Sequence, residues 1–175
     1  MSRVSHKIAF AVLLALAGTG VFVSNVLATA PTPAPGLVQT VKGPYSFAPF
    51  DVRVRFPLRT FWPSWRVHLS ARGQSDVYYV DNVFQPGAST GWHSHPGPSF
   101  ILVVSGTVTN YEGGGGHCSI TQYSAGSGFM DQGGNDIHMI KNNSTAPAET
   151  IALQVLPQGQ PRRIDEQDPG TCPGQ

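Results

Sequence analysis

Two histidines one residue apart precede an apolar run in the stretch 87–106, GASTGWHSHPGPSFILVVSG. Side chains two positions apart on an extended strand point to the same face, so His93 and His95 can direct two imidazole nitrogens at one point. Imidazole nitrogen is a common ligand of transition metals. Residues 100–104, FILVV, predict a buried strand that ends in the Ser-Gly turn at 105–106. We interpret this stretch as half of a metal site carried by strands.

Glycine and proline interrupt the rest of the chain and favour strands over helices. The chain has 20 glycines and 15 prolines among 175 residues, and no dozen residues beyond its N-terminus place apolar side chains at helical spacing. Apolar and polar residues alternate over 51–56 and 65–70, as in strands with one solvated face. The length allows one domain of ordinary size, which we expect to be all-β. Further strands are predicted at 77–84, 107–111, 120–123, 128–131 and 149–156.

The histidine stretch resembles the first motif of the cupin superfamily, G-x5-H-x-H-x3-E-x6-G. Gly87, His93, His95 and Gly106 all fall in register with this motif. The chain departs from it at one position, where the metal-binding glutamate of the motif corresponds to Ser99. Because Ser99 lies four residues after His95, strand parity directs it at the same cavity as the histidines. A hydroxyl is a poor metal ligand, and it can instead hydrogen-bond a metal-bound water.

The stretch GGNDIHMIKN, residues 133–142, resembles the second cupin motif, G-x5-P-x-G-x2-H-x3-N. His138 and Asn142 match the H-x3-N end of that motif. The start fits less closely, since Gly133 stands where the proline is expected and Asn135 where the glycine is expected. The resemblance implies that His138 is the third metal ligand.

The resemblance also implies the fold, an all-β double-stranded β-helix, which is the antiparallel cupin jelly-roll barrel of two packed sheets. The metal lies inside one end of such a barrel. We assign residues 75–157 to the barrel, 45–74 to an N-terminal β extension of its sheets, and 158–175 to a polar C-terminal tail. The segments TGWHSHPGP, HMIKN, RRID and DPGTCP resemble, more narrowly, a group of exported bacterial cupin-domain proteins.

The chemistry of the expected site follows from its donor atoms. Three histidines without a protein carboxylate form a neutral site of three nitrogens, which suits iron, manganese, zinc, copper or nickel and leaves positions open for water or substrate. No catalytic residue is evident, although Asp136 is a candidate acid–base or outer-shell group close to His138. The alternative interpretation is that His93 and His95 cap a strand near a proline turn and bind no metal.

Other histidines and a group of arginines are expected to be solvated. His68 falls on the polar side of its strand and His117 in a glycine-rich loop. The arginines are interpreted as a solvated sheet face, with a clamp for an anionic ligand as the alternative. They are Arg53, Arg55, Arg59, Arg66 and Arg72.

The N-terminus has the pattern of a signal peptide. A basic start precedes an apolar run over 8–23 and a small-residue site, so we predict that residues 1–28 are cleaved after Ala28. An uncleaved N-terminal membrane anchor is the alternative, because the run is almost long enough to span a bilayer. Residues 29–44, TAPTPAPGLVQTVKGP, are rich in proline and small residues and predict an extended linker.

Export, to the periplasm or the medium, would place the two cysteines in an oxidising compartment, where a disulfide persists. We therefore predict a bridge between Cys118 and Cys172, with two unpaired thiols as the alternative. Loss of Arg3 and Lys7 with the signal peptide reduces the 11 Lys and Arg to nine, against ten Asp and Glu. A net charge near −1 gives no reason to expect a nucleic-acid partner.

Cupin domains serve many functions, so the resemblance leaves several hypotheses open. One is a metal-dependent dioxygenase, or another oxidoreductase, that acts on a small molecule. A second is a non-catalytic module that binds a metal or a small ligand, and a third is a structural barrel with an empty site. The resemblance is also compatible with a homodimer formed through an edge strand.

Overall fold

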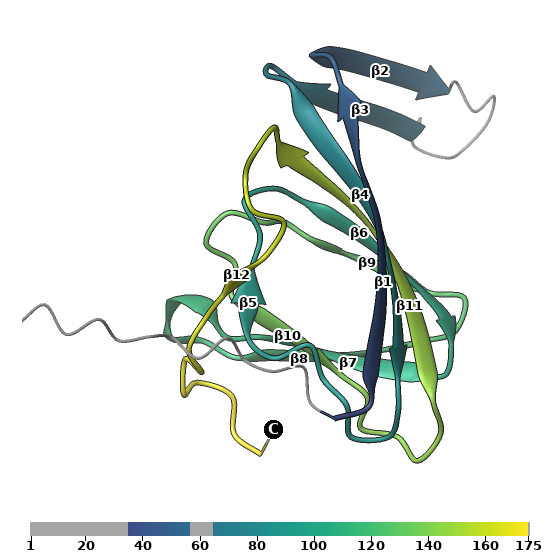
Figure 1. Ribbon diagram of the computed structural model, residues 1–175, viewed down its shortest axis with the longest axis vertical. Coiled ribbons are helices and arrows are strands. Elements are labelled where there is room, and N and C mark those ends of the chain that lie inside the picture. The colour runs from purple at the N-terminus through teal and green to yellow at the C-terminus, as the bar shows by residue number, and fades with distance from the viewer. Residues whose placement is uncertain (1–34, 57–64, 175) are drawn as a thin grey trace, which may run out of the picture.

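The computed structural model describes residues 35–56 and 65–174. Within these two ranges the chain consists of strands and loops, and its one helical element is a 3-10 turn at Gly114–Gly116. The strands form two five-stranded antiparallel sheets and a separate two-stranded ribbon (Figure 1). The predicted all-β double-stranded β-helix is therefore confirmed.

The first sheet joins strands that are far apart in the sequence. In sheet order these are β1 (Leu37–Phe47), β4 (Ser75–Phe84), β11 (Ala148–Pro157), β6 (Ser99–Ser105) and β9 (Gly128–Asp131). The central strand β11 pairs along its whole length with β4 on one side, and from Glu149 to Gln154 with β6 on the other. The predicted strands at 77–84, 128–131 and 149–156 thus belong to a single sheet, in which the first and the third are neighbours and the second lies at the edge.

The second sheet contains the strands that carry two of the histidines. In sheet order these are β12 (Ile164–Asp165), β5 (His93–Ser94), β10 (His138–Lys141), β7 (Thr107–Glu112) and β8 (Ser119–Ser124). The two sheets enclose the interior of the barrel between them (Figure 1). β5 and β12 lie side by side, across the barrel interior from β1 and β11 (Figure 1).

Apolar side chains from both sheets fill the core. Phe84 of the first sheet and Val108 of the second are fully buried, with 0% of their surface exposed. Val103 and Ile140 pack into the same cluster. Burial of one such side chain is worth about 1.5–3 kcal/mol, so these contacts hold the two sheets face to face.

The prediction of a buried strand at residues 100–104 is wrong for one face of that strand. Ile101 and Val103 are buried at 3% exposure each, whereas Leu102 and Val104 are 55% and 46% exposed. Successive side chains of a strand point to opposite faces, and only one face of β6 lies against the core. The continuous apolar run therefore predicted burial of both faces of β6, whereas one of these faces is exposed to solvent.

Folded structure begins at Leu37, inside the segment 29–44 that was predicted to be a linker. The strand β1 pairs with β4 from Leu37 opposite Phe84 to Phe47 opposite Ser75. Most of its side chains are exposed, so backbone hydrogen bonds to the edge of the sheet hold it in place. Composition alone could not reveal this strand, because it buries little apolar surface.

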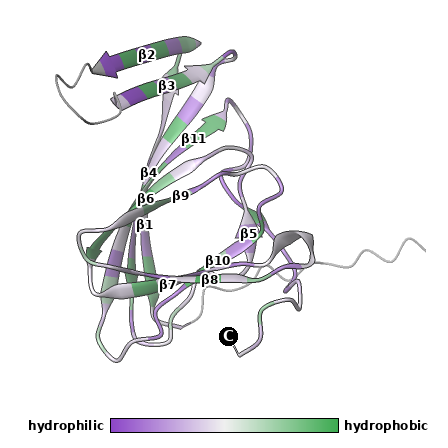
Figure 2. Cartoon of the chain, turned by 180° about the vertical axis from the view of Figure 1, so that it is seen from behind, coloured by the Kyte–Doolittle hydropathy of each residue, from purple (hydrophilic) through white to green (hydrophobic). Residues whose placement is uncertain are grey.

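The strands β2 (Phe50–Phe56) and β3 (Trp65–Ala71) confirm the predicted alternation but not the predicted placement. They pair with each other from Phe50 opposite Ala71 to Phe56 opposite Trp65 and, among the described residues, join neither barrel sheet. They form a ribbon at one end of the molecule, along which apolar and polar residues alternate (Figure 2). Residues 45–74 thus contain part of β1 and this ribbon, rather than one extension of the sheets.

Cys118 and Cys172 form the predicted disulfide. Cys172 is 4% exposed and packs against Trp92, Tyr111 and Met139, so the bridge fastens the end of the chain to the second sheet. No helix in the described parts of the chain is long and apolar enough to span a membrane. The predicted signal peptide and its cleavage site after Ala28 lie outside the described residues.

Candidate metal centre

The three histidines selected from the sequence meet at one point inside the barrel. His93 belongs to β5 and stands directly opposite His138, the first residue of β10, while His95 follows two positions after His93. All three are buried, with 4%, 3% and 2% of their surface exposed for His93, His95 and His138. One ligand atom of each lies within 4.8 Å of the others. The arrangement allows all three to reach a single metal ion.

Backbone carbonyls fix the orientation of each imidazole ring. The Nδ1 atom of every ring lies within hydrogen-bond distance of a carbonyl oxygen, so Nδ1 carries the proton and Nε2 keeps the lone pair. Metal-binding histidines are commonly held in this way by a partner on the second nitrogen. The carbonyl partners are Gly91 for His93 at 2.9 Å, Arg162 for His95 at 2.7 Å and Asp136 for His138 at 3.4 Å.

Two of the rings are neutral at neutral pH because they are buried. Burial lowers the pKa of His93 well below its usual range, and the electrostatic interactions with His138 and Arg163 lower it further. Burial also lowers the pKa of His95 to about 4. Neutral imidazole is the form that binds metal, so no proton has to leave either ring when a metal binds.

A carboxylate that the sequence analysis missed lies beside the histidines. Asp131, the last residue of β9, is 4% exposed. Its Oδ2 lies 3.7 Å from Nε2 of His95 and its Oδ1 lies 3.7 Å from Nδ1 of His138. The group of side chains whose ligand atoms converge consists of the three histidines, as expected, and Asp131 lies beside this group. Asp131 had been counted only as the end of a predicted strand, and its approach depends on a cross-strand register that no local pattern reveals.

Ser99 faces the histidine cavity, as strand parity predicted. It is 1% exposed and lines the cavity together with His93, His95 and His138. Its hydroxyl donates a hydrogen bond to Oδ2 of Asp131 at 3.2 Å. The position that holds glutamate in the cupin motif thus holds a hydroxyl that orients a carboxylate on the neighbouring strand.

Asp136 contributes to the site through its backbone. Its carbonyl oxygen accepts the hydrogen bond from His138, and among the described residues no hydrogen bond or ion pair joins its carboxylate to the histidines. The proposal that Asp136 serves as an acid–base group has no geometric support. The nearest acidic group to the rings is Asp131.

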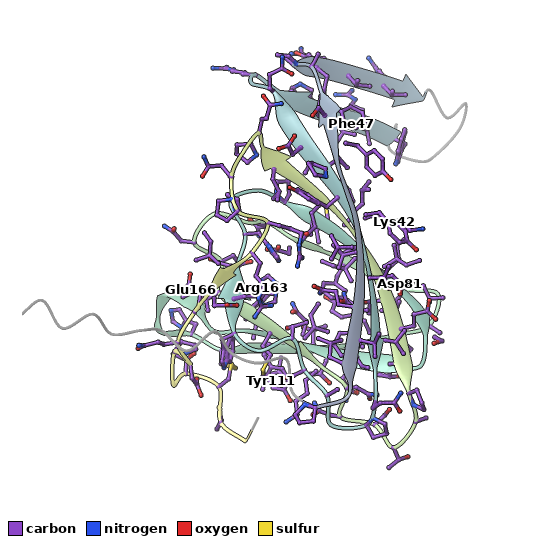
Figure 3. The ribbon with its side chains drawn as sticks, in the orientation of Figure 1. Lys42, Phe47, Asp81, Tyr111, Arg163 and Glu166 are labelled. Atoms are coloured by element: carbon purple, nitrogen blue, oxygen red, sulfur yellow. A yellow bond between two sulfur atoms is a disulfide. The ribbon has the colours of Figure 1, made fainter. Side chains whose placement is uncertain are left out.

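The C-terminal segment 158–175 is more than the polar tail that was expected. Its strand β12 pairs with β5, with Asp165 opposite His93, and so completes the second sheet. Arg162 and Arg163, which precede this strand, line the histidine cavity, and Arg163 lies beside β5 in Figure 3. The Nη1 atom of Arg162 donates to Oε1 of Gln154 at 3.2 Å, and Nε of Arg163 donates to Oδ1 of Asp165 at 2.6 Å.

The residues expected to be solvated lie away from the site. His68 is on the exposed ribbon, where its Nε2 lies 3.1 Å from Oδ1 of Asp51, and His117 is exposed in its loop. Four of the five arginines are also exposed, while Arg59 lies outside the described residues. The four are Arg53, Arg55, Arg66 and Arg72.

Comparison with known proteins decides the family. Residues 82–154 match the model of the cupin domain family, and this span contains both histidine strands and β9. Residues 82–154 form a cupin domain. The N-terminal ribbon and the arginine pair of this cupin protein lie outside the matched span.

Solved structures similar to this cupin protein share limited identity with it. A cupin superfamily protein from Desulfitobacterium hafniense DCB-2 is 14% identical at a TM-score of 0.40, over 46% of this chain and 67% of that one. An oxalate oxidase is 22% identical at a TM-score of 0.44, over 52% of this chain and 45% of that one. The cupin chain thus spans less than half of that oxidase.

An uncharacterised conserved protein with a double-stranded β-helix domain from Klebsiella pneumoniae subsp. pneumoniae MGH 78578 is 22% identical at a TM-score of 0.43. This similarity covers 69% of the present chain and 86% of the Klebsiella chain. No curated protein sequence matches the chain.

Proposed function

We propose that this chain is an exported cupin-domain protein whose His93, His95 and His138 hold one divalent transition metal. The observation that carries the proposal is the convergence of three buried imidazoles whose Nδ1 atoms are all occupied by backbone carbonyls. This leaves the three Nε2 atoms for one ion, and at His95 this atom also lies 3.3 Å from the side-chain amide nitrogen of Gln154. A set of imidazole nitrogens suits iron, manganese, zinc, copper or nickel.

The activity that we propose for the site is oxidoreductase chemistry on a small molecule, of the dioxygenase kind. A redox-active metal bound to three histidines keeps open positions, at which it supplies Lewis acidity or a platform for dioxygen. The protein contributes three histidines whose rings are held by backbone carbonyls, with the buried carboxylate of Asp131 beside them. The alternative is a non-catalytic module that binds metal or a small ligand at the same residues.

Metal analysis of the purified protein, joined to oxygen-uptake measurements, tests this proposal. The protein should be produced by export, so that its disulfide forms, and assayed over a panel of small phenols and thiols. One equivalent of iron, copper or manganese with oxygen consumption supports the oxidoreductase. One equivalent of zinc without turnover supports the binding module. Protein that takes up no metal after incubation with each of the five ions contradicts the whole proposal.

Export is proposed from the pattern of residues 1–28 and from the disulfide. A bridge between Cys118 and Cys172 persists in the periplasm or outside the cell, whereas the cytosol keeps thiols reduced. The buried position of Cys172 against Trp92 indicates that the bridge belongs to the folded core of the second sheet.

A further inference from the structure

The buried carboxylate of Asp131 lies opposite position 99, at which the cupin motif has a glutamate and this chain has a serine. Ser99 and Asp131 are direct partners in the antiparallel pair of β6 and β9. Opposite residues of such a pair project from the same face of the sheet, with their Cβ atoms about 4.5–5.5 Å apart. A carboxylate on either strand can therefore enter the same cavity.

The surroundings of Asp131 hold it in position but do not balance its charge. Oδ1 accepts a hydrogen bond from the backbone N–H of Gly133 at 2.8 Å, and Oδ2 accepts one from the Ser99 hydroxyl at 3.2 Å. Within the described residues, the ion-pair partners within 4.0 Å of this carboxylate are His95 and His138, with no lysine or arginine among them. Buried carboxylates that carry a charge are paired with a cation or coordinate a metal.

The distances place Asp131 at the edge of a coordination sphere. Two ligand atoms that each lie about 2.1 Å from a tetrahedral or octahedral ion are about 3.0–3.4 Å apart. Oδ2 of Asp131 is 3.7 Å from Nε2 of His95, a few tenths of an ångström more than that separation. The other oxygen, Oδ1, lies 3.7 Å from Nδ1 of His138, so the carboxylate has to turn as well as move to bind the same ion.

We propose that Asp131 supplies the carboxylate ligand of the metal centre, in place of the glutamate that the cupin motif puts at position 99. The inference rests on the proposed metal binding by the three histidines. It makes the site a set of three nitrogens and one oxygen with a single negative charge. Ser99 then acts as a positioning residue, because its hydroxyl orients the Asp131 carboxylate.

The test compares metal affinity in four purified proteins by competition with a chromogenic chelator, for zinc and for cobalt. Asp131→Asn keeps the shape of the side chain and removes the charge, and it should weaken binding at least about tenfold. Asp76→Asn is the matched control, because Asp76 is an equally buried aspartate at 6% exposure that bonds to the N–H of Gly159. Its metal affinity should equal that of the unaltered protein.

The fourth protein carries Ser99→Glu together with Asp131→Asn and returns the carboxylate to the position of the motif. It should recover most of the lost affinity, and its cobalt absorption spectrum should approach that of the unaltered protein. Unchanged affinity in Asp131→Asn, or a double variant that folds but shows no recovery, overturns the inference while the histidine site stands. If the unaltered protein binds neither ion, the proposed function itself fails. If Asp131→Asn does not fold, the metal affinity of the double variant alone tests the inference.

A different observation concerns the other wall of the cavity. The Nη2 atom of Arg163 is buried and has no hydrogen-bond partner in the described structure. Its Nε is held by Asp165 at 2.6 Å, which fixes the guanidinium beside the cavity that Arg163 lines with the histidines. The neighbouring Arg162 donates only to the neutral oxygens of Gln154 and Gln39. The guanidinium groups of Arg162 and Arg163 thus both line the cavity. In the described structure, Asp165 is the one carboxylate that pairs with either of them.

We infer that Arg163 forms a subsite for a small carboxylate ligand next to the metal centre. A guanidinium with a free N–H edge binds carboxylates through directed, charge-assisted hydrogen bonds. Nη2 has no hydrogen-bond partner in the described structure, so an anion that pairs with it replaces no protein contact. The cavity has a volume of about 30 Å³, so a side chain of its wall must move outward to admit a carboxylate.

Titration of metal-free protein with acetate and with acetamide, followed by NMR chemical shifts at constant ionic strength, tests the subsite. Acetate should bind and the neutral, isosteric acetamide should not. Arg163→Gln should weaken acetate binding about tenfold or more. Arg163→Lys keeps the charge but not the planar edge, so its affinity for acetate should lie between those of Arg163→Gln and the unaltered protein. Arg66→Gln on the exposed ribbon is the control and should change nothing. Equal binding of both ligands, no acetate binding, or acetate binding unaffected by both Arg163 variants overturns the inference.

Discussion

His93 and His138 lie directly opposite each other in the antiparallel pair of β5 and β10, with their ring centroids 4.3 Å apart. The register of two short strands therefore sets the distance between two of the three imidazoles. His95, two residues after His93, adds the third ring with centroids 4.8 Å and 5.3 Å from the other two. A change in this strand pair should alter the whole site at once.

Removal of one imidazole should nearly abolish metal binding. His93→Ala and His138→Ala each delete one of three nitrogen ligands, and we expect the dissociation constant for zinc to rise by more than about 100-fold. Chelator competition measures the change. His68→Ala is the control, because His68 is exposed on the ribbon and pairs with Asp51. Normal affinity in both site variants would show that the histidines are not ligands.

Gly133 should tolerate a side chain far less well than its neighbour Gly134. Both have a positive φ, +73° and +71°, so alanine costs about 1–2 kcal/mol of backbone strain at each. A Cβ at Gly133 would also overlap the carbonyl group of Gly97, whereas nothing lies within 4 Å at Gly134.

The expected result is that Gly133→Ala lowers the free energy of unfolding more than Gly134→Ala does. Because the N–H of Gly133 holds Asp131, Gly133→Ala should also weaken zinc binding. Chemical denaturation and chelator competition measure the two effects. Similar losses in both variants would show that the contact with Gly97 relaxes without cost.

Loss of the disulfide should destabilise the protein substantially. Cys118 and Cys172 are 54 residues apart, and closing a loop of that length is worth about 4 kcal/mol in the chain-entropy treatment. The double substitution Cys118→Ala with Cys172→Ala should lower the free energy of unfolding accordingly in urea. Thiol titration of unfolded, unreduced protein should find no free thiols. Two reactive thiols per chain would rule out the bridge in the isolated protein.

The exported protein should begin at Thr29. Cleavage after Ala28 follows from the apolar run and the small residues that end it. The intact mass of protein recovered from the periplasm or the medium measures this directly. A mass that retains residues 1–28, found in the membrane fraction, would support the uncleaved anchor instead.

Local patterns were sufficient for much of the fold and for the histidines. Alternation predicted the ribbon strands β2 and β3, and the flanking turns predicted β9 and β11 close to their observed bounds. The two motifs identified His93, His95 and His138. They could do so because the alternation of side chains along a strand, and the distance from a histidine to the nearest turn, can both be read from a short stretch of sequence.

Long-range pairing decided what local patterns could not indicate. The strand β1 forms on the edge of β4 with little burial, and β12 of the supposed tail pairs with β5 to bring Arg162 and Arg163 to the cavity. In neither case does the segment carry an apolar pattern of its own. Its structure comes from backbone hydrogen bonds that a distant strand offers.

The sequence by itself determined the all-β class, most of the strand positions and the three imidazoles, because these depend on residues that are close along the chain. Only the tertiary structure decided that Asp131 stands opposite Ser99 and beside the histidines. The physical reason is the register of β6 against β9. A shift of one residue would turn Asp131 to the outer face of the sheet, and the register is set by packing across the whole barrel.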